Sequence, residues 1–269
     1  MGNVFTSVAP SYDRMNDLMS LGIHRLWKDY FVRSLNPGVS SLSASSDPAP
    51  EAQTILDVAG GTGDIALRLL DHMTLINNDT ASRIIVSDIN PKMLSAGRHR
   101  LSSYPCPSNA ESSYVKEGRV DFLEANAEEF PTIEDGSIDL YTVAFGIRNF
   151  TSVPRALATA YRVLKPGGVF ACLEFSKVRN PVLNGLYKRW SFGAIPLIGQ
   201  LVAGDRDSYQ YLVESIERFP GQREFQRMVR EAGFEVPRAE MGEVGEEGNG
   251  WVDLTGGVAC VHKGVKLVK

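Results

Sequence analysis

Short apolar runs alternate with stretches of helical periodicity through the middle of the chain. Five runs are each too short for a helix and are bounded by polar or turn-forming residues, which predicts buried strands. They lie at 54–58, 84–86, 120–123, 138–145 and 169–175. Helices are predicted between them, at 64–72, after Pro91 and from an N-cap at Thr151 or Ser152. Strands that alternate with helices predict a parallel sheet covered on both faces.

The two ends of the chain depart from this alternation. A helical pattern over 12–33 is expected to break at Gly22, and the Ser- and Pro-rich residues 38–50 and the polar residues 102–118 predict loops. Residues 176–218 are irregular to helical, and a helix around 225–232 ends at Gly233. Strands at 235–241 and 257–262, joined by an acidic loop at 242–250, predict an antiparallel pair at one edge. We expect one domain over 1–269, with the helical segment 4–35 and the insertion 176–218 forming a substrate side.

Composition narrows the possible functions. The 269 residues carry a net charge of −4 without a basic block, which disfavours nucleic-acid binding. The three cysteines form no C-x-x-C pair and the four histidines no H-E-x-x-H motif, so no metal site is predicted. No apolar run reaches the roughly 18 residues of a membrane-spanning helix. The N-terminus shows neither a signal peptide nor an Arg-rich transit segment.

A Gly-rich turn joins the first strand of the alternation to the helix that follows it. Gly60, Gly61, Thr62 and Gly63 form this turn, and Asp57 lies just before it inside the strand. Glycines allow a ligand to approach the backbone closely, and open α/β sheets bind ligands at the carboxyl ends of their strands. The turn therefore predicts a nucleotide-type cofactor.

Two acids bear on which cofactor binds. Asp57 would attract the ammonium and sulfonium groups of S-adenosylmethionine and repel a pyrophosphate. Asp88 closes the second strand, where a carboxylate can accept hydrogen bonds from ribose hydroxyls in either type of cofactor. Because the turn also fits a loose G-x-G-x-x-A pattern, an NAD(P)-dependent oxidoreductase is the alternative, although the chain has no Tyr-x-x-x-Lys pair.

Several further segments together resemble a known family. They are Tyr12–Ser20 (YDRMNDLMS), His24–Trp27 (HRLW), Phe145–Asn149 (FGIRN), Leu173–Lys177 (LEFSK) and Asp207–Leu212 (DSYQYL). With these segments the chain resembles the ubiquinone/menaquinone biosynthesis C-methyltransferases, and among them the eukaryotic mitochondrial members, from about Val4 to the C-terminus except in the three loops. The resemblance implies a class I methyltransferase fold, with a Rossmann-like sheet that is mostly parallel, an antiparallel edge strand and helices on both faces.

The resemblance also implies cofactor contacts. S-adenosylmethionine would meet Thr62, Asp88, Asn126 and Ala127, the last two through the adenine edge. Family members often have Ser where this chain has Ala144, so a backbone contact there would replace a hydroxyl.

Three residues are candidates for catalysis. A ring carbon of a hydroquinone becomes nucleophilic once a ring hydroxyl is deprotonated, so the site must favour the phenolate. Arg148 and Asn149, at the end of the fourth strand, are the candidates, with the guanidinium stabilising the phenolate by its charge. The alternative for Arg148 is a structural salt bridge. Tyr12 would hydrogen-bond the quinol oxygen or pack over the cleft. Glu174 is a weaker site candidate, with a hydrogen bond to a neighbouring loop as the alternative, and Tyr209 and Tyr211 either line an apolar passage for the prenyl tail or belong to the core.

The implied reaction is C-methylation of a 2-methoxy-6-polyprenyl-1,4-benzoquinol in ubiquinone biosynthesis. The implied partners are a multi-subunit complex of that pathway and a peripheral membrane surface, with a homodimer as a further option. The implied location is the matrix face of the mitochondrial inner membrane. A demethylmenaquinol or a sterol as methyl acceptor, and a non-catalytic scaffold, are the open alternatives.

Overall fold

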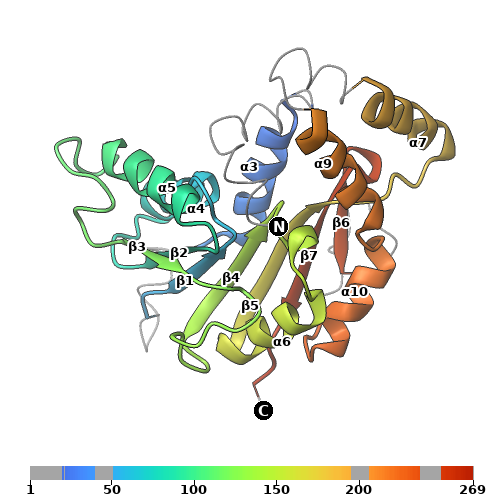
Figure 1. Cartoon of the computed structure of the whole chain (residues 1–269). Coiled ribbons are helices and arrows are strands. Elements are labelled where there is room, and N and C mark those ends of the chain that lie inside the picture. The colour runs from blue at the N-terminus through green and yellow to red at the C-terminus, as the bar shows by residue number, and fades with distance from the viewer. Residues whose placement is uncertain (1–19, 21, 40–50, 195–205, 237–249, 269) are drawn as a thin grey trace.

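A seven-stranded sheet forms the centre of the protein in the computed structural model, which describes residues 20, 22–39, 51–194, 206–236 and 250–268. Its strands lie in the order β3-β2-β1-β4-β5-β7-β6 (Figure 1). Their bounds are β1 Thr54–Val58, β2 Arg83–Asp88, β3 Val120–Glu124, β4 Ile138–Ala144, β5 Leu164–Phe175, β6 Trp251–Leu254 and β7 Ala259–Val265. The first five strands run parallel, while β7 runs antiparallel to both β5 and β6, so the antiparallel pair at the edge is confirmed.

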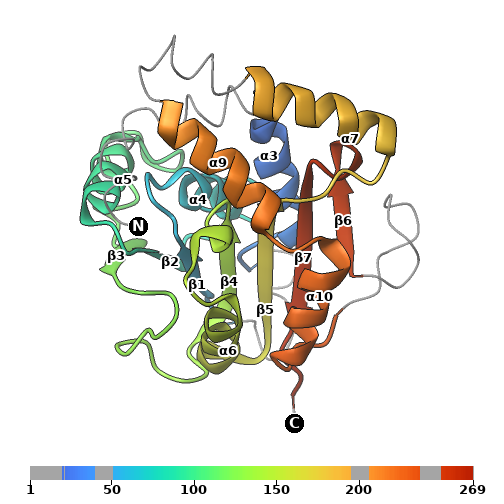
Figure 2. The same ribbon diagram turned by 45° about the vertical axis from the view of Figure 1, so that its right-hand side comes forward.

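Helices cover both faces of the sheet, as predicted (Figures 1 and 2). Their bounds are α3 His24–Leu35, α4 Asp64–Leu75, α5 Pro91–Ser103, α6 Val153–Val163, α7 Pro181–Lys188, α9 Arg206–Arg218 and α10 Gln222–Glu231. Successive side chains of a strand point to opposite faces. Ile55 of β1 accordingly packs in the core beneath α3, α4 and α5, and Leu56 packs in the core beneath α6 and α10. Burial on both faces explains why the strands appear in the sequence as continuous apolar runs.

The starts of several elements follow from local sequence. Asn90 and Ser152 cap α5 and α6 through their side chains, which settles the choice between Thr151 and Ser152. Gly22 has a φ of +78°, which agrees with the predicted break before α3. The predicted helical positions 12–19 and the loop 40–50 lie outside the described residues.

The prediction for the late strands is incomplete. Of the predicted strand 235–241 the structure describes Glu235 and Val236, and Glu235 forms an isolated bridge to Val265; residues 237–249 lie outside the described part of the chain. The strand β6, which pairs with β7 and is four residues long, was missed by the apolar pattern. The strand β5 begins at Leu164, directly after α6 and before the predicted start at 169, and its register against β4 shifts between Ile138 and Leu140.

The insertion predicted as a loop at 102–118 is anchored to the core. Tyr114 is fully buried, and its hydroxyl donates a 2.8 Å hydrogen bond to Oδ1 of Asp71 on α4. The guanidinium of Arg119 lies 5.5 Å from the centroid of the Tyr114 ring. A polar segment is therefore held against α4 by a buried aromatic side chain.

This anchor gives a stability prediction. Tyr114→Ala should lower the free energy of unfolding by about 3–5 kcal/mol, as truncation of a buried aromatic ring usually does. Chemical denaturation checks this, with the exposed Glu111→Ala in the same insertion as the control. A loss below about 1 kcal/mol would mean that the insertion packs independently of the core.

Candidate active site

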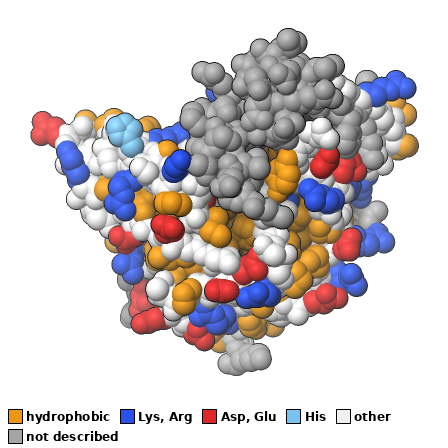
Figure 3. Space-filling view, viewed as in Figure 1, with side chains coloured by type: hydrophobic (Ala, Val, Ile, Leu, Met, Phe, Trp, Pro, Cys, Tyr) orange, Lys and Arg blue, Asp and Glu red, His pale blue; other side chains and the backbone are white. Residues whose placement is uncertain are grey.

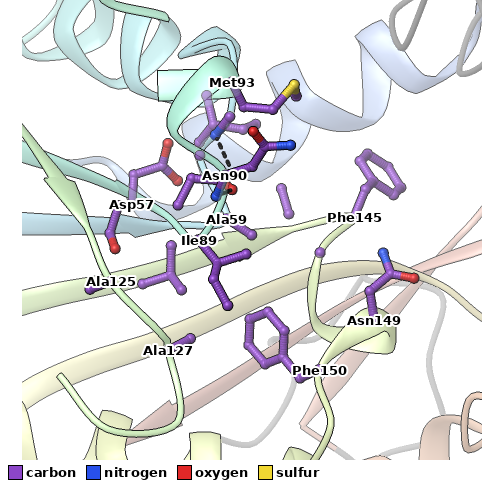
Figure 4. A pocket seen from close by; sticks show the side chains of 18 of the residues that line it. Asp57, Ala59, Ile89, Asn90, Met93, Ala125, Ala127, Phe145, Asn149 and Phe150 are labelled. Atoms are coloured by element: carbon purple, nitrogen blue, oxygen red, sulfur yellow. Dashed lines mark hydrogen bonds between the residues drawn. The ribbon is translucent and has the colours of Figure 1, made fainter. Parts of the chain in front are cut away.

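A cavity of about 460 Å³ opens where the Gly-rich turn meets the carboxyl ends of the parallel strands (Figure 4). It takes residues from α3, from the ends of β1, β2 and β4, from the start of α5 and from the loop after β3. Of the twelve predicted site residues, nine line it: Asp57, Gly60, Gly61, Thr62, Asp88, Asn126, Ala127, Ala144 and Asn149. The position agrees with the rule for open α/β sheets.

Asp57 is the most perturbed group in this cavity. Its side chain is 1% exposed, and the hydroxyl of Thr142 on β4 donates a 2.8 Å hydrogen bond to its Oδ1. Its Oδ2 is buried and has no hydrogen-bond partner among the described residues. Burial raises the pKa of Asp57 to about 7, against the opposing bond from Thr142. A desolvated carboxylate with a spare oxygen is a site for a cationic group of a ligand.

Glycine is required at the turn because Asp57 lies so close to it. A Cβ on Gly60 would stand 2.8 Å from Oδ2 of Asp57 and 2.8 Å from Cγ1 of Val86. Gly63, in contrast, does not line the cavity. It precedes α4 with a φ of +75°, and its role is to start that helix.

Asp88 joins the end of β2 to the turn. Its Oδ2 accepts a 3.1 Å hydrogen bond from the backbone N–H of Gly61, and its Oδ1 accepts a 2.8 Å bond from that of Asn90. Burial raises the pKa of Asp88, although these bonds oppose the shift. Because each carboxylate oxygen has two lone pairs, both can still accept a ribose hydroxyl.

The loop after β3 supplies one wall. The side-chain oxygen of Asn126 accepts a 3.0 Å hydrogen bond from the backbone N–H of Glu128, which fixes the turn. Ile89, Ala127 and Phe150 lie together in this part of the cavity (Figure 4). Their apolar side chains form a slot suited to a purine ring. Ile89 was not predicted as a site residue. The signal in the sequence is an apolar residue directly after Asp88, the acid that closes β2, and in the structure Ile89 is 66% exposed.

Asn149 and Arg148, the predicted catalytic pair, differ in whether they face the cavity. Asn149 lines the cavity, and its side-chain oxygen accepts a 3.4 Å hydrogen bond from the hydroxyl of Tyr211 on α9. Arg148 does not line it, and its guanidinium is 2% exposed. Nη1 donates to Oε1 of Glu174 at 2.7 Å and to the carbonyl oxygen of Phe145 at 2.6 Å. The structural salt bridge weighed as the alternative is therefore present, and its carboxylate is buried rather than on the surface.

The Arg148–Glu174 pair ties the strand end to the helix α9. Nε of Arg148 donates to the hydroxyl of Ser215 at 3.3 Å, and Oε1 of Glu174 accepts the backbone N–H of Phe175 at 2.9 Å. Burial raises the pKa of Glu174, whereas the charge of Arg148 lowers it. The third candidate, Tyr12, lies outside the described residues, as does the side chain of Tyr209.

The described residues contain no group of three or more His, Cys, Asp or Glu side chains that could hold a metal ion. They do fit S-adenosylmethionine. The free oxygen of Asp57 suits its ammonium, Asp88 suits its ribose, and the apolar slot suits its adenine. Sheet order, turn and cavity together define a class I methyltransferase.

Comparison with known proteins identifies the family. Residues 1–266 match the family model described as the ubiE/COQ5 methyltransferase family, and the chain belongs to that family. It is therefore a methyltransferase, with S-adenosylmethionine as its methyl donor.

Two curated relatives are similar over nearly the whole chain. One, from Schizosaccharomyces pombe, is named mitochondrial 2-methoxy-6-polyprenyl-1,4-benzoquinol methylase and is 53% identical over 98% of this chain and 78% of its own length. The other, from Brucella suis, is named ubiquinone/menaquinone biosynthesis C-methyltransferase UbiE and is 46% identical over 99% of this chain and 85% of its own.

A solved SAM-dependent methyltransferase from Thermotoga maritima has the same fold. It aligns with a TM-score of 0.56 and 19% identity over 99% of each chain. At this identity the likeness concerns the fold alone.

The buried carboxylate leads to a prediction about stability and pH. Asp57→Asn should raise the thermal midpoint above pH 7, because the wild-type protein must hold an ionised group there without water. Below the unfolded-state pKa of 3.8, Asp57 is protonated in both the folded and the unfolded protein, so the stability gained by the substitution should vanish. Between that pH and the folded-state pKa of about 7, the gain should grow as the pH rises. Thermal denaturation of both proteins between pH 4 and pH 8 tests this.

The same substitution should weaken binding of S-adenosylhomocysteine at pH 8 by about 10- to 100-fold, the usual effect of losing a charge-assisted hydrogen bond. A variant that is destabilised at pH 8, or that binds as tightly as the wild type, would contradict this role for Asp57.

Proposed function

We propose that this enzyme methylates a ring carbon of a 2-methoxy-6-polyprenyl-1,4-benzoquinol, a step of ubiquinone biosynthesis. The observation that carries the proposal is identity of 46–53% over nearly the full chain to enzymes named for this pathway. The cavity supports it, because Asn149 and Phe150 border the cofactor pocket on the side of α9.

The chemistry requires little from a metal. The methyl group of the sulfonium donor is already activated, so the chain must align the ring carbon with it and favour the phenolate form of the quinol. Asn149 is proposed to hold a ring oxygen through its amide, with Tyr211 fixing the amide's orientation by the 3.4 Å hydrogen bond. Tyr12 is proposed as a second contact to the quinol.

Arg148 is proposed to serve the reaction by holding Asn149 in place as much as by its charge. Its guanidinium holds the carbonyl of Phe145 at the end of β4, the hydroxyl of Ser215 on α9 and the carboxylate of Glu174 on β5. These three bonds fix the turn that presents Asn149. Because the carboxylate of Glu174 offsets the charge of Arg148, the guanidinium stabilises a phenolate on the quinol ring only weakly. Its larger contribution to the rate is then the alignment of Asn149.

The test is conversion of a short-chain analogue of the proposed quinol under reducing conditions, followed by mass spectrometry. The expected product carries one added methyl group on a ring carbon, located by fragmentation, and appears only with S-adenosylmethionine. A demethylmenaquinol analogue runs in parallel, because the Brucella relative is named for both quinones. Cofactor binding without methylation of either quinol would overturn the proposed substrate.

Membrane contact is proposed at α7. Between Glu174 and Asp205 the sequence has four basic residues and no acidic one. Val182 and Leu183 on α7 are 73% and 41% exposed, and apolar and basic side chains lie side by side at this corner of the molecule (Figure 3). This combination suits an anionic lipid surface, from which a polyprenyl quinol would enter the site. None of the helices formed by the described residues meets the length and apolarity needed to cross a bilayer.

The cellular setting follows from the same relatives. The relative from Schizosaccharomyces pombe is named mitochondrial. We extend the proposal to the matrix face of the inner membrane, to assembly with other enzymes of the pathway and to a homodimer.

The positioning role of Arg148 predicts a specific kinetic result. Arg148→Lys should fold and bind S-adenosylhomocysteine as the wild type does, since Arg148 does not line the cavity. Its kcat should fall by about 10²-fold, because a lysine cannot make the three divergent bonds and misalignment is costly. Arg155→Lys, in an exposed ion pair, is the control. An unchanged kcat per folded molecule would leave Arg148 with a role in stability only.

The α7 surface predicts binding to vesicles. Leu183→Asp and Val182→Asp should each reduce co-sedimentation with vesicles containing anionic lipid, with activity on a water-soluble quinol unchanged. Val268→Asp is the matched control, because Val268 is 76% exposed near the C-terminus, at the other end of the molecule (Figure 1). Equal loss in all three variants, or binding to neutral vesicles alone, would count against α7.

A further inference from the structure

Lys28 of α3 places a buried ammonium on the wall of the cofactor cavity, outside the sheet and the Gly-rich turn. Its side chain is 7% exposed, and its Nζ donates a 2.8 Å hydrogen bond to Oδ2 of Asp64. Nζ also lies 6.0 Å from the centroid of the Phe145 ring. An ammonium has three donors. Within the described part of the chain Asp64 is its one hydrogen-bond acceptor, so further donors are available to a ligand.

The ion-pair cluster that contains Lys28 has more cations than carboxylates. Asp64 forms ion pairs with Lys28, Arg68 and Arg100, and Arg68 also pairs with Asp29. Burial alone would raise the pKa of Asp64, but its three cationic partners hold that pKa at about 2. Three cations therefore face two carboxylates. Lys28 and Asp64 both line the cavity, whereas Arg68 and Arg100 do not, so Lys28 is the cation of this cluster that a ligand would meet.

The arrangement also lets Lys28 change partner at small cost. If the ammonium turns away from Asp64, that carboxylate keeps Arg100 at 3.1 Å and Arg68 at 3.4 Å. No buried charge is then left unpaired, which is the usual penalty for breaking such a pair.

Two complementary charges thus border the same turn. The unpartnered Oδ2 of Asp57 is buried at the end of β1, just before the turn, and the ammonium of Lys28 is bonded to Asp64, the first residue of α4 after the turn. The first backbone N–H groups of a helix lack intrahelical partners and carry partial positive charge. An anion held by Lys28 beside this helix end, with a cation held by Asp57, matches the zwitterionic end of an α-amino acid.

We propose that Lys28 binds the carboxylate of the methionyl end of S-adenosylmethionine, while Asp57 binds its ammonium. Lys28 then makes the enzyme select adenosyl ligands that carry this carboxylate, and α3 becomes part of the cofactor site. The proposal rests on S-adenosylmethionine being the cofactor.

The test compares two ligands that differ only in the carboxylate. Calorimetric titration of the full chain with S-adenosylmethionine and with decarboxylated S-adenosylmethionine gives the preference directly, without turnover. The wild-type protein should prefer the carboxylated ligand by about 10- to 100-fold, as expected for a charge-assisted hydrogen bond. Lys28→Met should bring the preference to about threefold or less, and the affinity for the decarboxylated ligand should hardly change.

The matched control is Arg100→Met, which removes another partner of Asp64 without touching the cavity and should keep the preference. Lys28→Gln, which retains a donor for Asp64, replaces Lys28→Met if the latter does not fold. Equal loss of affinity for both ligands in the Lys28 variant, or a preference that survives it, would overturn the inference. Failure of the wild type to bind either ligand would instead refute the cofactor assignment.

Discussion

The site depends on one carboxylate that the fold keeps away from water. Asp57 lies inside β1, an interior strand of a sheet covered on both faces, so its ionised form is costly until a cation binds. Thr142 compensates one oxygen and leaves the other for the ligand. The protein thereby gives up some stability near neutral pH in exchange for a binding site, a common relation between stability and function.

The surrounding structure serves this group. The strands β2 and β4 lie on either side of β1 and run parallel to it. Asp88 and Thr142 therefore lie near Asp57, toward the carboxyl ends of the strands. Gly60 lets the turn close over the carboxylate without a clash. On the far side, the Arg148–Glu174 pair joins β4 and β5 to α9, so the wall that faces the substrate is built on the same rigid strand ends as the cofactor site.

The sequence predicted the parts whose determinants are local. Buried strands, caps and the Gly-rich turn depend on neighbouring residues, and Asp57, Asp88 and Asn149 were predicted as site residues from their places at strand ends. The predictions for Asn126, Ala127 and Ala144 depended instead on the family resemblance. Lys28 and the inward turn of Arg148 could not be predicted this way, because their partners Asp64 and Glu174 are 36 and 26 residues away. The short strand β6 was missed because its four residues are too few to show a periodicity. Asp253 interrupts their apolar run, and Gly250 comes directly before it.

The most direct measurement is an NMR titration of the Asp57 side-chain carboxyl, assigned by comparison with Asp57→Asn. In the ligand-free protein its pKa should be near 7, as burial requires. Saturation with S-adenosylhomocysteine should lower the pKa by more than one unit, because the ammonium of the ligand stabilises the ionised form. A free-state pKa near 4, or a pKa that does not move when the ligand binds, would contradict the account.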